Sequence, residues 1–340
     1  MKTVIIGAGA IGGVTAVYMA QGGADVTLVC KRQSAANTIE HTGIHITGKR
    51  GEHWIKTKAV PSVSDLKDTY DFALIATKAY DMPQVAQEII PYMNENGLIV
   101  SFQNGICIDQ LSEIVGKERA VQAVVTWSCT MIGDAEYEFT AEGGFIIGAA
   151  NGMTDERITQ LKSLLDLVAP ARISEDIMSE MYSKLIINSA ITCGGALTGV
   201  KLGRLLHDKY ARDFFIRIVQ EDIALAKTMG IQVPPFGGQL DYYRFAEGSG
   251  FFDQIRRNAT LRAVGMKYKD LKSSSLCSLE RGGKTEVDIL NGWIAQKGRE
   301  YNISVPVNEK ITEMIKQIER GERISRMENM KELMQTAGKE

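Results

Sequence analysis

The stretch MKTVIIGAGAIGG (residues 1–13) decides the fold of the first part of the chain. It opens with a short apolar run that is typical of a buried β-strand, and its glycines then follow the spacing G-x-G-x-x-G. In this spacing the first glycine turns sharply out of the strand, the second lets the backbone approach a pyrophosphate, and the third lets the next helix pack close to the sheet. The stretch therefore predicts a dinucleotide-binding loop formed by Gly7, Ala8, Gly9, Ala10, Ile11 and Gly12.

The residues around this loop complete a strand–loop–helix–strand unit. A helix is expected from near Ala10, where its free N–H groups and positive dipole end would face the phosphates. A second apolar strand is expected at residues 25–29. A glycine-rich turn without a ligand is the alternative, but a loop that follows a strand and opens a helix favours nucleotide binding.

The residues after the second strand indicate which dinucleotide is bound. A site selective for NAD carries a carboxylate at the C-terminal end of this strand, where it accepts a hydrogen bond from the ribose 2′-hydroxyl. Here Lys31 and Arg32 stand at that end, and the nearest acid, Asp25, lies at the opposite end. Arginine can bind a 2′-phosphate through two hydrogen bonds, and lysine adds a point charge. We therefore expect NADP(H), and the alternative is a solvated basic loop.

Composition narrows the class of protein. A chain of 340 residues is long enough for two domains. The net charge of −2 gives no general attraction to nucleic acid or to a membrane, so neither is expected as a partner. The five cysteines are odd in number and never spaced C-x-x-C, which is typical of reduced thiols. No signal peptide or membrane-length apolar stretch is visible, and we expect a cytoplasmic protein.

No metal site is expected from the histidines. His41 and His45 fall in a Gly/Thr-rich segment, HTGIHITG, which we interpret as part of a surface hairpin.

Hydrophobic patterning predicts a Rossmann-type, doubly wound and mostly parallel sheet in the first part of the chain. Apolar strands alternate with helices, and strands of this kind are buried on both faces. Further strands are expected at residues 71–77, 97–102, 119–126 and 171–174, and helices at 85–93 and 154–168. Two hairpins are expected, at residues 43–60 and, across Gly143 and Gly144, at residues 137–149.

From residue 178 the apolar residues recur with helical period. The long candidates are residues 178–196, 211–229, 285–301 and 309–320. The last twenty residues alternate in charge and are expected to form a solvated or interface helix. The domains are therefore predicted as residues 1–176, α/β and NADP-binding, and 177–340, all-helical. The apolar helical domain and the methionine-rich tail are compatible with a homodimer.

Two candidate binding residues follow strands of the predicted sheet. Ligands of open α/β sheets lie beyond the carboxyl ends of the strands, so we expect the active site in a cleft between that edge and the helical domain. Lys78 follows the strand that ends at Thr77, and Asn104 follows the strand that ends at Phe102. An ordinary loop lysine and a plain Asn-Gly turn are the alternatives.

Lys184 and Asn188 are the sharpest candidates for chemistry. They lie four residues apart, hence on one face of a helix that is otherwise strongly apolar. Burying a cation costs several kcal/mol unless it has a partner, and desolvation lowers the pKa of a lysine toward the range that a general acid requires. The alternative is that Lys184 extends its charged end to solvent.

Several motifs of the chain resemble ketopantoate reductases in their order and spacing. They are GAGAIGG, Lys31, TKAY at 77–80, QNG at 103–105, Lys184-x-x-x-Asn188, Ser273-Ser274 and TEVDILNG at 285–292. The resemblance covers nearly the whole chain. It implies NADPH-dependent reduction of a 2-keto acid to a 2-hydroxy acid, typically of 2-dehydropantoate to pantoate.

Site roles follow from the resemblance by position. Lys184 would be the general acid, Asn188 would hold the substrate and Ser274 would bind its carboxylate. Glu286 would face the cofactor–substrate region, while Asn104, Lys78 and Lys31 would serve the cofactor. Without the resemblance, Ser274 reads as a loop serine and Glu286 as an acid at a helix N-terminus.

Two features depart from the family pattern. Thr192 stands where a second asparagine is common and offers a hydroxyl in place of an amide, and residues 234–272 are long and aromatic. A reductase of another branched or aromatic 2-keto acid is therefore the main alternative. A protein that senses NADPH without turnover is the other, although sensing does not need a proton donor.

Overall fold

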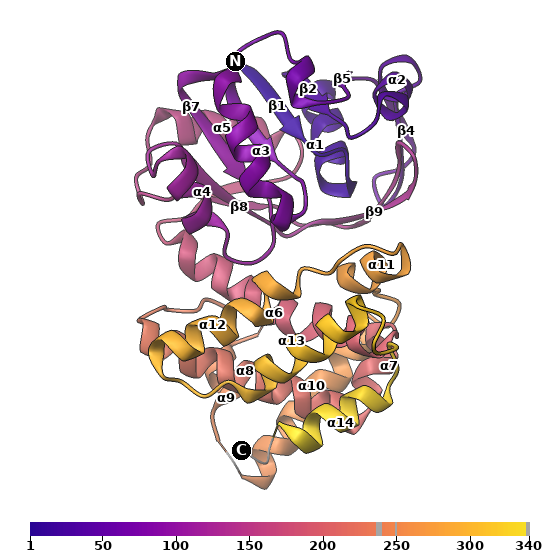
Figure 1. The fold of residues 1–340 in the computed structure, drawn as a ribbon, viewed down its shortest axis with the longest axis vertical. Helices are drawn as coiled ribbons and strands as arrows, with labels where there is room; N and C mark the ends of the chain where they lie inside the picture. Colours follow the sequence, from indigo (N-terminus) through magenta and orange to yellow (C-terminus); the bar gives the residue numbers. More distant parts are fainter. Residues whose placement is uncertain (236–239, 249, 338–340) are drawn as a thin grey trace. The chain divides into compact units, whose positions relative to one another are not determined.

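The structure is a computed structural model that describes residues 1–235, 240–248 and 250–337. The chain divides into two compact units, one of Met1–Gln103 with Cys107–Ile177 and the other of Asn104–Ile106 with Met178–Glu340. The first unit contains the strands, and the second is helical (Figure 1). This confirms the predicted fold class, an α/β Rossmann-type unit followed by an all-helical one.

The first unit is built on a doubly wound sheet. Among the described residues the sheet has the order β12-β11-β8-β7-β6-β1-β2-β5. Its strands are β1 (Lys2–Ile6), β2 (Asp25–Val29), β5 (Lys58–Val60), β6 (Tyr70–Ile75), β7 (Met93–Ser101), β8 (Ala120–Val125), β11 (Phe145–Ala149) and β12 (Ala171–Ile173). All neighbours are parallel except β8 and β11. Strand order reverses between β1 and β6, which is the point where such sheets bind ligands.

Helices connect the strands of this sheet. They are α1 (Ala10–Gln21), α2 (Gln33–His41), α3 (Met82–Ile89), α4 (Ile108–Val115) and α5 (Glu156–Asp166), with 3₁₀ turns η1 (Val63–Asp65), η2 (Ala79–Asp81) and η3 (Ile90–Tyr92). The strands read as continuous apolar runs because both faces are covered, and Ile5, Leu74 and Val100 are fully buried.

A second sheet, which was not predicted from the sequence, packs against α1. Its order is β4-β3-β10-β9, formed by β3 (Ile44–Gly48), β4 (His53–Ile55), β9 (Ser128–Gly133) and β10 (Glu136–Ala141). The predicted hairpin at 43–60 is correct for β3 and β4, but residues 58–60 join the main sheet as β5. His41 ends α2 and does not belong to the hairpin, whereas His45 stacks on Trp54 and bonds Glu52.

The predicted hairpin at 137–149 is wrong. Residues of β10 belong to the second sheet and those of β11 to the main sheet, so the segment crosses from one to the other. A β-carbon on Gly143 would lie 2.5 Å from the carbonyl of Thr126, and one on Gly144 would lie 2.2 Å from the Pro170 oxygen. The two glycines therefore permit close passage of backbones where the sequence pattern indicated a turn.

The second unit consists of packed helices. They are α6 (Ile177–Thr198), α7 (Leu202–His207), α8 (Lys209–Met229), α9 (Tyr242–Ala246), α10 (Phe251–Lys267), α11 (Ser274–Glu280), α12 (Asn291–Tyr301), α13 (Pro306–Glu319) and α14 (Glu328–Thr336). The helix predicted at 285–301 starts six residues too early. A 3₁₀ turn, η4 (Val287–Ile289), precedes it, and Leu290 has non-helical dihedrals (φ −103°, ψ −103°). Glu286 thus stands before the turn and does not open the helix.

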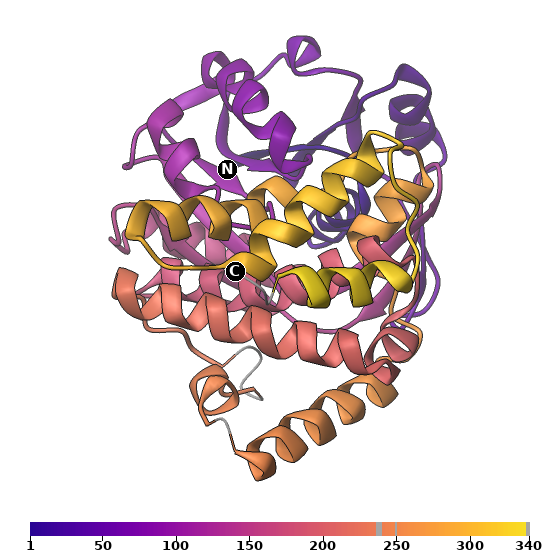
Figure 2. The ribbon, with the colours of Figure 1, turned by 60° about the horizontal axis from the view of Figure 1, so that its bottom comes forward.

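The aromatic segment 234–272 forms α9 and α10, apart from residues 236–239 and 249, which lie outside the described residues. In Figure 2 the orange α10 lies at the margin of the helical unit. The buried guanidinium of Arg257, on α10, donates to the carbonyl oxygens of Phe245, Ala246 and Glu247, so it holds the end of α9. The hydroxyl of Tyr242 donates to the carbonyl of Ser183, which anchors α9 on α6.

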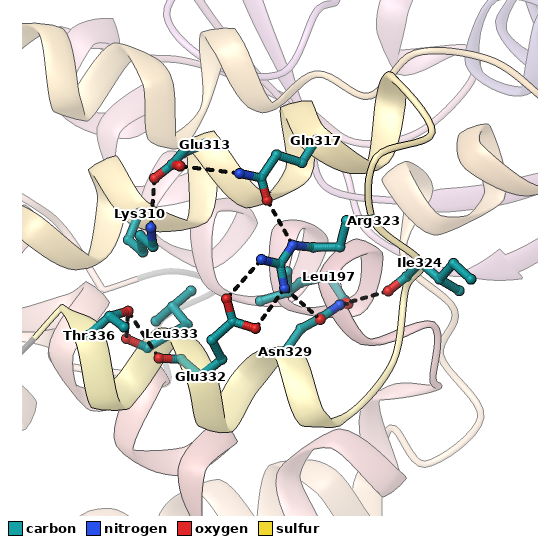
Figure 3. A network of polar contacts seen from close by, with 10 residues as sticks. All are labelled: Leu197, Lys310, Glu313, Gln317, Arg323, Ile324, Asn329, Glu332, Leu333 and Thr336. Atoms are coloured by element: carbon teal, nitrogen blue, oxygen red, sulfur yellow. Dashed lines mark hydrogen bonds and ion pairs between the residues drawn. The ribbon is translucent and has the colours of Figure 1, made fainter.

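The described part of the C-terminal segment, which ends at Ala337, is integrated into the unit. Of the two predicted alternatives, a solvated or an interface helix, the solvated one is therefore wrong. Met330 and Leu333 are fully buried. Asn329, also fully buried, donates through Nδ2 to the carbonyls of Leu197 and Ile324 at 3.0 and 2.9 Å (Figure 3). Its Oδ1 accepts from Arg323, which also pairs with Glu332. The Leu197 carbonyl, at the C-terminal end of α6, is thus satisfied by Asn329 together with the N–H of Arg326.

Replacing Asn329 by alanine should lower the free energy of unfolding by about 1–3 kcal/mol, because the Leu197 and Ile324 carbonyls each lose a donor and the Arg323 guanidinium loses an acceptor. Gln335→Ala, at an exposed position of the same helix, is the matched control and should change stability little. Chemical denaturation of both variants measures the difference. Equal stability of the two variants would contradict a structural role of this network.

None of the helices in the described residues is both long enough and apolar enough to cross a membrane.

Candidate functional site

Two glycines of the N-terminal loop are required by the packing of the first unit itself. Gly7 has φ +112°, and a β-carbon there would lie 2.9 Å from the carbonyl carbon of Ala76. A β-carbon on Gly12 would lie 2.0 Å from the Gly7 oxygen. The first and third glycines thus allow the tight turn and the close approach of α1 to the strands.

Gly9 differs from both. Its φ of −76° suits any residue, and among the described residues other than its two chain neighbours no atom lies within 4 Å of the β-carbon it lacks. Gly9 is the N-cap of α1 without a side-chain cap, and the first turn of α1 carries no acid. Ala8, Ala10 and Ile11 are half-buried around it. Open space beside uncapped helical N–H groups fits the phosphates of a dinucleotide.

A buried tyrosine of the second sheet holds this loop in place. The hydroxyl of Tyr137 donates to the carbonyl of Ala8 at 2.7 Å, and a β-carbon on Gly13 would touch its ring at 2.7 Å. Burial raises the pKa of Tyr137, so the hydroxyl stays a neutral donor. Sequence reasoning missed Tyr137, although a buried tyrosine needs a partner for its hydroxyl.

Lys78 lies at the switch point of the sheet. It stands three residues after the end of β6, is half-buried and precedes η2 as its N-cap. A β-carbon on Gly7 would lie 3.0 Å from the backbone nitrogen of Thr77, so the end of β6 and the glycine loop are adjacent. The side-chain oxygen of Thr77 is buried and has no hydrogen-bond partner within the described residues.

Gln103 has a structural role. Its amide nitrogen donates to the carbonyls of Ile75 at 3.0 Å and Thr77 at 3.2 Å, and its own amide oxygen accepts from Ser101. It therefore fastens the ends of β6 and β7. Asn104, the next residue, is half-buried and groups with the helical unit.

Lys31 and Arg32 lie exposed directly after β2, whose last residue, Val29, accepts a hydrogen bond from the N–H of Gly7. Arg32 Nη2 lies 2.5 Å from Asp134 Oδ1, on the turn between β9 and β10. The end of β2 that precedes these cations is therefore adjacent to the glycine loop, and Arg32 has an acidic partner that was not predicted.

In the helical unit Lys184, Asn188 and Thr192 recur every four residues along α6, hence on one face. Lys184 is half-buried, and burial lowers its pKa to about 8 against the opposing effect of the Glu286 carboxylate. Asn188 Nδ2 is buried and has no hydrogen-bond partner within the described residues. Thr192 is buried. A lysine of lowered pKa near a buried carboxylate and an amide donor can transfer a proton to a bound oxygen.

Two further segments approach this face. Ser273 donates to the carbonyl of Thr192 at 3.1 Å and caps α11, and Ser274 follows it as the exposed first residue of that helix. Gly105, with φ +79°, packs against η4, because a β-carbon there would lie 2.5 Å from the Ile289 oxygen. Asn104 thereby belongs to a segment that contacts the turn directly after Glu286.

A glycine loop at the switch point of a doubly wound sheet, followed by a helical unit, defines an α/β dinucleotide-binding protein of the oxidoreductase type. The model of the ketopantoate reductase PanE/ApbA family matches residues 3–152, and the model of its C-terminal region matches residues 176–319. The chain belongs to this family.

Individual relatives agree with this assignment. The chain is 26% identical to a 2-dehydropantoate 2-reductase of Aquifex aeolicus over 93% of this chain and 96% of that protein. A PanE/ApbA family ketopantoate reductase from Ralstonia eutropha has a similar fold, with a TM-score of 0.80 and 24% identity. The match covers 94% of this chain and 99% of that protein. A D-mandelate dehydrogenase in complex with NADH and anilino(oxo)acetate also has a similar fold, with a TM-score of 0.79 and 21% identity. The match covers 94% of this chain and 99% of that protein.

Proposed function

We propose that this protein reduces 2-dehydropantoate (ketopantoate) to pantoate with NADPH. The observation that carries the proposal is Lys184, a lysine of α6 whose pKa burial lowers to about 8, on one helix face with the buried amide nitrogen of Asn188. The face of α6 with Lys184 would supply the proton donor, and the open glycine loop would supply the coenzyme site. The names of its curated relatives support the substrate.

NADPH, when bound, supplies the hydride for the keto carbon. Lys184 Nζ donates the proton to the keto oxygen, and its positive charge stabilises the negative charge that develops there. Glu286 favours the protonated form of Lys184 by its charge. The coenzyme is held by residues 7–12 together with Lys31, Arg32, Lys78, Asn104 and Glu286. The substrate is held by Asn188, Thr192, Ser274 and Asn104.

Reduction of another branched or aromatic 2-keto acid is the second candidate. Thr192 offers one hydroxyl where an amide is common in the family, and α9 contacts α6 at Ser183, next to Lys184. The fold is also that of a D-mandelate dehydrogenase, which acts on an aromatic acid by its name. A non-catalytic NADPH sensor is disfavoured, since a sensor does not need the lowered pKa of Lys184.

A panel of 2-keto acids tests the proposal. The absorbance of NADPH is followed with ketopantoate, 2-ketoisovalerate and phenylglyoxylate, and kcat/KM is compared among them. The highest value with ketopantoate supports the proposal, and a higher value with phenylglyoxylate or 2-ketoisovalerate supports the second candidate. No turnover with any acid, together with tight NADPH binding, supports the sensor.

Lys31→Ala should weaken NADPH binding about tenfold and change NADH binding little, because a charge-assisted contact to the 2′-phosphate is lost. The dissociation constants of both coenzymes are measured by fluorescence titration. Lys56→Ala, an exposed lysine of the same unit, is the control and should leave both constants unchanged. Equal weakening of both coenzymes would show that the preference for NADP(H) is misassigned.

The expected homodimer and cytoplasmic location stay predictions from the sequence.

A further inference from the structure

The second sheet brings an acid to the coenzyme end of the first unit. Asp134 lies on the turn between β9 and β10, and its carboxylate pairs with the guanidinium of Arg32 at 2.5 Å. The two residues are 102 positions apart in the chain. In NAD-selective sites of this fold a carboxylate stands at the end of β2. This chain has cations there, and Asp134 supplies a carboxylate to the same place from another sheet.

The position of Asp134 is held by its neighbours. Ala135 adopts a left-handed conformation, with φ +58°, and its carbonyl accepts a hydrogen bond from the His45 N–H at 2.9 Å. Tyr137, two residues further on, donates to Ala8 in the glycine loop. The strand β10 and the turn before it therefore hold both the glycine loop and the carboxylate beside Arg32.

We propose that Asp134 is a selectivity residue that limits the preference for the phosphorylated coenzyme. Its carboxylate competes with the 2′-phosphate for Arg32 and repels that phosphate, while it can accept a hydrogen bond from the 2′-hydroxyl of NADH. The inference rests on the proposed function, because it places the adenosine ribose beside Lys31 and Arg32. In addition, the protein can use both coenzymes, and an acid distant in sequence sets the ratio of their dissociation constants.

The exposure of the Arg32–Asp134 ion pair determines how strongly Asp134 can change the coenzyme preference. The side chains of Arg32 and Asp134 are 57% and 63% exposed, and exposed ion pairs contribute little to stability. The 2′-phosphate can therefore displace the carboxylate from Arg32 at small cost. Lys31 has no acid of this kind within the described ion pairs, so it continues to favour NADPH. Asp134 thus modulates the preference and does not reverse it.

Asp134→Asn tests the inference on the full chain by measuring dissociation constants for NADPH and NADH. NADPH should bind about 3- to 10-fold more tightly, and NADH the same or more weakly, with the difference decreasing at high salt. Glu138→Gln is the matched control, because it removes the same charge at an exposed position of β10, the strand that follows the turn of Asp134. In an Arg32→Ala background, Asp134→Asn should have a smaller effect on NADPH binding, since the competition for Arg32 is gone.

The outcomes separate this inference from the proposed function. If the ratio of the NADPH and NADH dissociation constants is the same in Asp134→Asn as in Glu138→Gln, and both coenzymes still bind, the role of Asp134 is overturned. Weaker NADPH binding in Asp134→Asn would also overturn it, because the carboxylate would then orient Arg32 toward the phosphate. Failure of the unchanged protein to bind either coenzyme would overturn the proposed function and this inference together.

Discussion

Lys184→Ala is expected to lower kcat by about 10²- to 10⁴-fold, which is the usual contribution of a positioned general acid. The variant removes the proton donor and the positive charge beside the keto oxygen. The dissociation constant for NADPH should stay near the value of the unchanged protein.

The pH dependence of kcat distinguishes a proton donor from a residue with a purely structural role. Burial lowers the pKa of Lys184 from its usual 10.5 to about 8, so the protonated form that donates prevails below pH 8 and is lost above it. Reduction should therefore slow as the pH rises through about 8, and this decline should be absent in Lys184→Ala. Lys201→Ala, at an exposed site of the same unit, should leave rate and profile unchanged. A Lys184→Ala variant with nearly full turnover would remove Lys184 from its role.

Gly9→Ala is expected to weaken binding of both coenzymes by about 10- to 100-fold without lowering the melting temperature. Its φ is ordinary and, apart from its two chain neighbours, no described residue has an atom within 4 Å of the added methyl group, so the fold tolerates it. The methyl group would occupy the space through which phosphate oxygens reach the N–H groups of α1. Loss of one such charge-assisted hydrogen bond costs about 1.5–3 kcal/mol.

Gly12→Ala is the matched comparison within the same loop. Its β-carbon would lie 2.0 Å from the Gly7 oxygen, so this variant should lose both stability and coenzyme binding. Calorimetric titration and thermal unfolding of the two variants separate the effects. Normal coenzyme binding by Gly9→Ala would mean that no ligand approaches this backbone, and the proposed phosphate site would be wrong.

The sequence was most informative where a structural requirement is local. The G-x-G-x-x-G spacing, the apolar run before it and the four-residue interval between Lys184 and Asn188 each involve neighbours along one strand or helix. The structure confirms the strand, the loop and both helices. The resemblance to ketopantoate reductases, carried by motifs of this kind over most of the chain, is confirmed by the family models.

Errors arose where the partner of a segment is distant in the chain. The alternation in residues 137–149 is compatible with a hairpin, but β10 pairs with β3 and β11 with β8. Alternating charge at the C-terminus indicated a solvated or interface helix, yet Asn329 is buried and bonds Leu197 and Ile324 of the same chain. Periodicity shows that a segment has an apolar face but does not identify what covers it.

By itself the sequence determined the fold class, the family, the glycine loop and a lysine on an apolar helix, because these depend on residue order over a few turns. Only the tertiary structure decided that Gln103 fastens strand ends, that Tyr137 holds the loop and that Asp134 pairs with Arg32. Each of these contacts joins residues that are distant in the chain, across paired strands for Gln103 and between segments of the two sheets for Tyr137 and Asp134, and the free energy of such contacts depends on geometry that no local pattern encodes.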